Sequence, residues 1–254
     1  MNAMKGSRKT RIFAAAALVS ASALVIAGCS STPSDSTSDG GDKPAADLTL
    51  KLGSLLPQTG SLAFLGPPME SGVGLAVEEI NAADAGIQIE LTAEDEGDTD
   101  TKAYETSITK LQGAGVTAIV GAAASGVSKL ILDGNVSAGI LQISASNTSP
   151  DFTDWADEGL YFRTAPSDLL QGEVLGNLIA EDGAKTLGII YQNDAYGTGL
   201  NAAITETFEA TGGEVVADPS FNVGDAQFDA QVETIKAANP AAVAIVSFEQ
   251  FKTI

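Results

Sequence analysis

The chain has 254 residues, of which 44% are hydrophobic, and its 13 basic and 33 acidic side chains give a formal net charge of −20 at pH 7. So acidic a surface repels phosphate backbones and anionic headgroups, which argues against a nucleic-acid partner. The chain has no histidine, so Ser/His/Asp and Cys/His catalysis are excluded and the commonest zinc ligand is missing. With one cysteine it can form no internal disulfide, and a buried core must stabilise it.

The N-terminal segment carries basic residues, then an uncharged apolar run at 12–26, then Ala27 and Gly28 before Cys29. It resembles a bacterial lipoprotein signal peptide at residues 1–28, with Cys29 as the lipid attachment site. This predicts an extracytoplasmic protein that is held to the lipid bilayer through Cys29. An ordinary signal peptide and a buried core cysteine are the alternatives, and the polar stretch that follows disfavours the second. Residues 29–47 are rich in Ser, Thr, Pro and Asp, which predicts a flexible tether.

From residue 48 onward, short apolar segments alternate with helical patterns. The predicted strands lie at 48–55, 87–93, 117–123, 140–145, 161–165, 186–192, 214–218 and 241–248. The first helical pattern places Met69, Val73, Ala76, Val77 and Ile80 on one face. Apolar strands that alternate with amphipathic helices indicate an α/β fold with parallel sheets covered on both faces.

The alternation breaks at 149–168, a loop-like segment that holds the only tryptophan. We therefore predict an N-terminal lobe at 48–164 and a C-terminal lobe at 165–254. The sequence stops after an apolar strand, where a covering helix is expected to begin. This predicts that the second lobe is incomplete.

Five segments, in order, resemble one family. The stretch 53–84 has the pattern G-x-x-x-P-x-T-G, followed by a helix that ends in LAVEEINAA, and the other segments are 118–128, 140–154, 161–172 and 189–200. They resemble the leucine/isoleucine/valine-binding type of periplasmic binding protein. The resemblance implies two Rossmann-like lobes of the type I periplasmic binding fold, with a ligand bound in the cleft between them.

Several residues are candidates for ligand binding. A helix is expected to begin near Ser125, where free N–H groups and the helix dipole suit a carboxylate, and Ser146 and Thr148 follow the next strand. By resemblance, these three match residues that hold the carboxylate and amino groups of an amino acid. For each one alone, a helix cap or a turn residue is an equally acceptable interpretation.

The resemblance implies two further ligand-binding residues. Asp168 matches an aspartate that binds the ligand's ammonium group, and Tyr196 matches a tyrosine that closes over the ligand from the second lobe. Asp168 could equally be the N-cap of a helix at 169–181, and Tyr196 a surface turn residue. Phe64 and Leu65 stand where branched-chain binders carry a tyrosine, which leaves the ligand's side chain open. Phe248 and Glu249 are possible substitutes for an acidic residue of the family's second lobe.

An acidic cluster invites a calcium interpretation: Glu94, Asp95, Glu96, Asp98 and Asp100. Its spacing lacks the calcium-loop pattern, so we expect a solvated loop before a helix, and no metal or cofactor site.

The combined expectation is a solute-binding lipoprotein that captures an amino acid and delivers it to an ABC permease. A sensory module that reports its ligand to a membrane partner, or a fragment that does not bind, are the alternatives. An enzyme is disfavoured, because no nucleophile motif is present.

Overall fold

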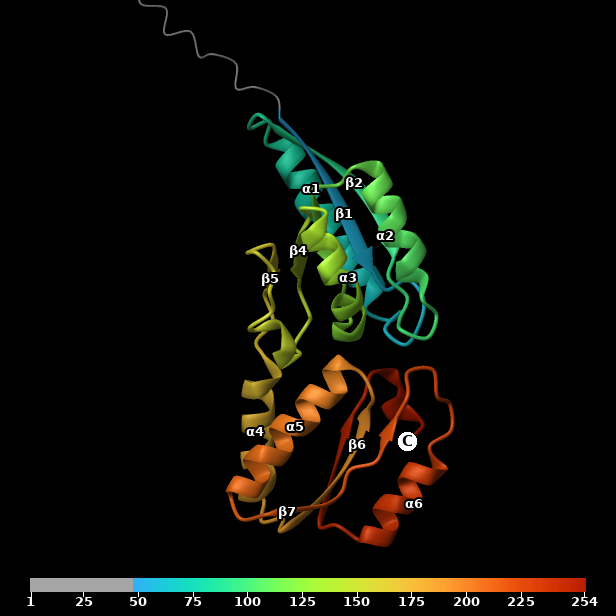
Figure 1. The fold of residues 1–254 in the computed structure, drawn as a ribbon, viewed down its shortest axis with the longest axis vertical. Coiled ribbons are helices and arrows are strands. Elements are labelled where there is room, and N and C mark those ends of the chain that lie inside the picture. The colour runs from blue at the N-terminus through green and yellow to red at the C-terminus, as the bar shows by residue number, and fades with distance from the viewer. Residues whose placement is uncertain (1–47) are drawn as a thin grey trace, which may run out of the picture. The chain divides into compact units, whose positions relative to one another are not determined.

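The structure is a computed structural model that describes residues 48–254. The predicted signal peptide, Cys29 and the predicted tether lie outside the described residues. Within 48–254, none of the helices has the length and apolar character needed to span a bilayer. The described chain forms two α/β lobes, each built on its own parallel sheet (Figure 1).

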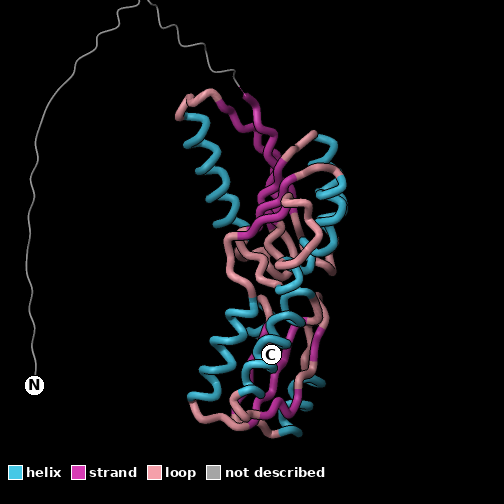
Figure 2. Tube along the Cα trace, turned by 60° about the vertical axis from the view of Figure 1, so that its left-hand side comes forward, coloured by secondary structure: helices cyan, strands magenta, loops and turns pink. Residues whose placement is uncertain are grey.

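The first lobe contains a five-stranded sheet in the order β2-β1-β3-β4-β5, in which every neighbouring pair is parallel. Its strands are β1 (Leu48–Leu56), β2 (Ile87–Asp95), β3 (Ala118–Gly121), β4 (Leu141–Ser144) and β5 (Tyr161–Arg163). Its helices are α1 (Gly66–Ala82), α2 (Ala103–Ala114) and α3 (Ser125–Ser137), with a short 3₁₀ helix, η1 (Pro150–Phe152). Figure 2 shows the strands of this lobe with helices on either side.

The core of the first lobe lies between the sheet and helices α2 and α3. Leu55, Leu111, Ile119 and Val127 are fully buried there. The chain leaves β3 through Gly121, whose φ is +128°, and a Cβ at this position would lie 2.0 Å from the carbonyl oxygen of Leu55. Only glycine allows this close approach, which lets the chain turn directly from the end of β3 into α3.

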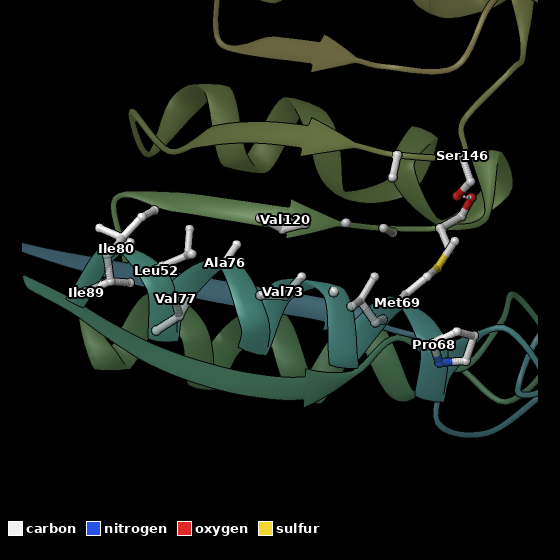
Figure 3. Close-up of a pocket in the computed structure, with 16 residues that line it drawn as sticks. Leu52, Pro68, Met69, Val73, Ala76, Val77, Ile80, Ile89, Val120 and Ser146 are labelled. Carbon is white, nitrogen blue, oxygen red and sulfur yellow. Dashed lines mark hydrogen bonds between the residues drawn. The ribbon is translucent and has the colours of Figure 1, made fainter. Parts of the chain in front are cut away.

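The opposite face of the first sheet is less well covered than expected. The apolar face of α1 does point toward β1 and β3, but it lines a cavity of about 430 Å³ with Leu52 and Val120 (Figure 3). Ile80 is 39% exposed, and Ile143 and Phe162 on β4 and β5 are 38% and 50% exposed. The expectation of two covered faces is therefore wrong for this side of the sheet, because α1 contacts mainly β1 and β2.

The second lobe contains a four-stranded parallel sheet with β6 at its centre. Its strands are β6 (Thr186–Gln192), β7 (Glu214–Ala217), β8 (Ser220–Phe221) and β9 (Ala242–Val246). Its helices are α4 (Asp168–Glu181), α5 (Ala195–Ala210) and α6 (Asp229–Ala238), with the 3₁₀ helix η2 (Glu249–Lys252). Its main core includes Leu187, Ile189, Ile204 and Phe208, all fully buried.

Two glycines set the close packing of α4 against α5. A Cβ at Gly172 would lie 2.4 Å from the Cβ of Ala203, and a Cβ at Gly176 would lie 2.8 Å from that of Thr207. The two helix backbones therefore approach more closely than any larger side chain would allow. This contact fixes the start of α4, and with it Asp168, relative to the second sheet.

The predicted order of strands and helices is confirmed, together with the parallel sheets. The two-residue strand β8 was not predicted. The suggested N-cap role of Asp168 is wrong: the N-cap of α4 is Ser167, whose side chain accepts a hydrogen bond from the amide of Leu169. Asp168 is instead the first helical residue.

Candidate ligand-binding site

A pocket of about 340 Å³ receives residues from both lobes. It lies at the carboxyl ends of the parallel strands, where open α/β sheets bind their ligands. Its lining residues are Leu62, Phe64, Leu65, Ala123, Ser125, Ser146, Thr148, Gln171, Tyr196, Ser247, Phe248 and Phe251. Six of the seven predicted ligand-binding residues are among them, and the seventh, Asp168, is hydrogen-bonded to Thr148.

One polar end of the pocket is the start of α3. The backbone amides of Ser125 and Gly126 donate no hydrogen bond to any group in the described part of the chain. The hydroxyl of Ser125 accepts from the amides of Thr148 and Ser149, at 3.2 and 3.3 Å, so its own proton is free to be donated. Free amides, a hydroxyl donor and the positive end of the helix dipole together suit a carboxylate.

Ser146 supports this end rather than facing the ligand with a free hydroxyl. Its Oγ donates to the carbonyl of Ala123 at 2.9 Å. The hydroxyl thereby holds the segment that leads into α3, which is a structural task that the sequence could not reveal. Its lining position still allows it to contact a ligand through other atoms.

The carboxyl group of Asp168 does not itself line the pocket but is hydrogen-bonded to the lining residue Thr148. The backbone amide of Asp168 donates to the carbonyl of Thr148, and the hydroxyl of Thr148 donates to Oδ2 of Asp168, both at 2.8 Å. Asp168 is fully buried, yet its Oδ1 has no hydrogen-bond partner among the described residues. An unpaired buried carboxylate oxygen is costly, so this atom is suited to accept from a ligand.

Burial is the main cause that raises the pKa of Asp168, to about 6. The hydrogen bond from Thr148 and the charge of Arg163 lower this pKa, while the charge of Asp194 raises it. Arg163 does not pair with the carboxylate directly, because its guanidinium donates to the carbonyl of Ser149 and the hydroxyl of Thr153. Asp168 therefore has no basic partner among the described residues. A cationic group on the ligand could serve as its counter-ion.

Tyr196 comes from the first turn of α5, whose N-cap is Asp194. Its ring stacks on Phe248 with centroids 5.3 Å apart and planes 13° apart. Burial, followed by the charges of Asp168 and Asp194, raises the pKa of Tyr196 to about 12. Its hydroxyl is therefore protonated at neutral pH and can act as a donor or an acceptor beside Asp168.

The remaining wall of the pocket is apolar. Leu65 and Phe248 pack against the core of the first lobe, and Phe64 is 52% exposed with the ammonium of Lys252 5.9 Å from its ring centroid. Phe248 was predicted as a substitute residue, and it does line the pocket. Glu249 does not; its carboxylate pairs with Lys252 at 2.7 Å. The pocket thus combines a polar end, at the start of α3, with an apolar wall.

Among the polar lining residues, sequence reasoning missed Gln171 and Ser247. Gln171 lies one helical turn after Asp168, so helical periodicity could have found it. Ser247 follows β9, at the strand end where ligands of this fold class bind. The expectation of a solvated acidic loop was also wrong in part, because Glu96 is 0% and Asp98 is 4% exposed. Among residues 48–254, no group of three or more acidic or sulfur side chains is placed to hold a metal ion.

Comparison with known proteins agrees with the fold. A family model described as periplasmic binding protein matches residues 49–252. The leucine-, isoleucine-, valine-, threonine- and alanine-binding protein of Pseudomonas aeruginosa is 32% identical over 197 residues, which are 76% of this chain and 52% of that protein. The chain spans about half the length of the curated relatives it matches.

Two solved structures are also similar. The branched-chain amino acid transporter substrate-binding protein LivJ from Streptococcus pneumoniae, in complex with isoleucine, has a TM-score of 0.66 and 30% identity, over 78% of this chain and 56% of that one. An ABC transporter solute-binding protein from R. palustris, in complex with benzoate, has a TM-score of 0.71 and 25% identity, over 80% and 56%. With its two parallel sheets and a pocket at their strand ends, this chain belongs to the periplasmic binding protein family.

Proposed function

We infer that the protein is an extracytoplasmic solute-binding lipoprotein that captures an α-amino acid in the pocket and delivers it to an ABC importer. The observation that carries this proposal is the position of Thr148. It is bonded on one side to the hydroxyl of Ser125, beside the free amides of α3, and on the other to the carboxylate of Asp168. One residue therefore separates an anion-binding end from a cation-binding end, as the two charges of an α-amino acid require.

The apolar wall favours an amino acid with an apolar side chain. Leu62, Leu65 and Phe248 offer no charged or amide group for a polar side chain. The names of the P. aeruginosa relative and of the S. pneumoniae structure point in the same direction. Leucine is therefore the first ligand to test.

The benzoate complex of the R. palustris relative suggests the competing class of ligand, an aromatic carboxylate. Such a ligand would satisfy the amides of α3 but would leave Oδ1 of Asp168 unpaired. The buried, unpaired oxygen is therefore the feature that favours an amino acid over a simple acid.

Calorimetric titration of the purified protein with leucine and three analogues tests the proposal. The analogues are 3-methylbutylamine, which lacks the carboxylate, 4-methylpentanoate, which lacks the amino group, and benzoate. We expect leucine to bind and each analogue to bind at least tenfold more weakly, since each leaves one charged end of the pocket unmatched (about 1.4 kcal/mol per tenfold). Binding of benzoate or 4-methylpentanoate as tight as that of leucine would contradict the assignment of Asp168. Absence of binding for every amino acid in a full panel would contradict the function.

The lipoprotein part of the proposal rests on the sequence before residue 48, and the transport part rests on relatives that are named as transporter binding proteins. A lipid on Cys29 and the polar segment after it would keep the lobes at the membrane surface while leaving them free to reach a permease. The gene neighbourhood discriminates transport from sensing. Permease and ATPase genes beside this one support an importer, and a kinase or cyclase gene in their place supports a sensor.

A further inference from the structure

Glu96 is a buried acidic residue that does not line the proposed ligand pocket. It follows the last residue of β2 and is 0% exposed. None of the ion pairs formed within residues 48–254 includes it. Burying a carboxyl group without a basic partner is unfavourable, so specific hydrogen bonds must compensate for the burial of Glu96.

Those bonds come from the segment that leads into α3. Oε2 of Glu96 accepts from the amide of Ala123 at 2.5 Å, and Oε1 accepts from the amide of Ala124 at 2.6 Å. Ala124 is the N-cap residue of α3, and its own side chain makes no cap hydrogen bond. Glu96 therefore supplies, from another part of the chain, the acceptor for the N-cap amide that the Glu or Gln at the third helical position of a capping box would provide; Val127 holds that position here.

The same segment is held from its other side through its carbonyl groups. The hydroxyl of Ser144 donates to the carbonyl of Ala122 at 2.7 Å. The hydroxyl of Ser146 and the side-chain Nδ2 of Asn147 both donate to the carbonyl of Ala123, at 2.9 Å. Residues 122–124, which we call the 122–124 link, are thus held on one side by the carboxylate that accepts from their amides and on the other by side chains that donate to their carbonyl groups.

Two N–H donors on two different oxygens fit an ionised carboxylate. A protonated acid or an amide presents only one carbonyl oxygen, and its O–H or NH₂ group would face the second N–H. Burial, with smaller contributions from the charges of Asp95 and Asp98, raises the pKa of Glu96 to about 8, while its two amide hydrogen bonds lower it. At neutral pH the side chain is therefore largely protonated, and the ionised form that matches both amides predominates only above about pH 8.

We propose that Glu96 is a positioning residue for the carboxylate end of the ligand pocket. Its two oxygens occupy the amides of Ala123 and Ala124, so that the amide of Ser125 is the first one left free for a ligand. Glu96 does not touch the ligand; it acts through the geometry of the 122–124 link. This inference rests on the proposed function, since it names a residue that serves the same site.

The test uses leucine and leucinamide, which differ only in the carboxylate. A residue that positions the carboxylate end should affect leucine more than leucinamide, whereas general destabilisation should weaken both equally. We expect Glu96→Ala, which removes both acceptor oxygens whatever the protonation state of the acid, to reduce leucine affinity tenfold or more and leucinamide affinity by less than threefold. The matched control is Glu94→Ala at the end of β2, where the carboxylate pairs with Lys110 on α2 and does not contact α3. We expect the control to behave like the wild-type protein.

A second measurement needs no variant. In the amide NMR spectrum of the wild-type protein, the signals of Ala123 and Ala124 should shift together on titration from pH 6 to 10, with a midpoint near the pKa of about 8. Both signals should be insensitive to pH in Glu96→Gln if that variant folds. A wild-type titration that persists unchanged in Glu96→Gln, or an unchanged ratio of leucine to leucinamide affinity in folded Glu96→Ala, would overturn the inference alone. Failure of the wild-type protein to bind any amino acid would overturn the proposed function, and the inference with it.

Discussion

Replacement of Asp168 by asparagine should weaken ligand binding and at the same time stabilise the fold. The substitution keeps the shape of the side chain and an oxygen that can accept from Thr148 at 2.8 Å, but it removes the charge. A hydrogen bond to a charged group contributes roughly 1.5–3 kcal/mol, so losing the ammonium contact should weaken leucine binding by about 10- to 100-fold.

The stability effect has the opposite sign, because Asp168 has no ligand to pair with in the empty protein. Its pKa of about 6 lies above the ordinary value of 3.8, so the folded protein holds this proton more tightly than the unfolded chain does. Stability is therefore lost as pH rises from about 4 to 6, by at most about 3 kcal/mol. Asparagine removes this loss and also a favourable charge in the first turn of α4, of about 0.5–1 kcal/mol. We expect a net stabilisation of about 1–2 kcal/mol at pH 7, and none at pH 4.

Urea unfolding at pH 4 and 7, with leucine titrations between pH 5 and 8, measures both effects. In the wild-type protein leucine affinity should fall below pH 6, up to about tenfold per pH unit, because protonation of Asp168 competes with the ammonium group. In Asp168→Asn the affinity should be low and independent of pH over this range. The control is Asp182→Asn, an exposed position at the C-cap of the same helix. Unchanged affinity and pH dependence in Asp168→Asn would refute the placement of the ammonium group.

Four other substitutions test separate parts of the protein. Tyr196→Phe keeps the stacking partner of Phe248 and loses only the hydroxyl, so calorimetry should show a three- to tenfold weaker affinity for leucine, a loss of about 1 kcal/mol, at an unchanged melting temperature. Gly172→Leu should destabilise the fold by more than 2 kcal/mol in urea unfolding because α4 would be forced off α5, whereas Gly113→Ala in α2, where nothing lies within 4 Å, should stabilise it by about 0.5–1 kcal/mol. Cys29→Ser should abolish incorporation of labelled palmitate and release the protein from the membrane fraction, and retention of the label would show that another group is acylated.

The sequence allowed the order of strands and helices to be predicted because apolar strands and amphipathic helices differ in period. It also placed Ser125 and Thr148 near each other, because the carboxyl ends of parallel strands share one edge of a sheet. The start of α4 could not be placed to the residue, since Ser167 and Asp168 are both good N-caps. Tertiary contacts decide between them: the amide and the carboxylate of Asp168 are both engaged by Thr148, so the cap is left to Ser167.

The burial of Glu96 was not predictable from its position in an acidic run. Its neighbours Asp95 and Asp98 hold turns by accepting from backbone amides, as a loop carboxylate is expected to do. Glu96 differs because it is fully buried and accepts no local amide; its partners are the amides of Ala123 and Ala124, 27 and 28 residues away in sequence. A one-dimensional pattern carries no information about such a pairing, so the sequence predicts a uniformly solvated run.

The charges around the pocket give the ligand a role beyond filling space. Asp168 begins α4 and Asp194 caps α5, and each carboxylate is partly or wholly buried. Burial raises the pKa of both groups, and the charge of Asp194 raises the pKa of Asp168 further. The ammonium group of a bound amino acid would offset this unfavourable buildup of negative charge. The carboxylate of the same ligand would engage the amides of α3 in the first lobe. Because the two ends of one ligand then stabilise groups on different lobes, binding should favour the arrangement in which both ends are engaged. A ligand with only one charged end would stabilise only one lobe, which is why the single-charge analogues discriminate between the proposals.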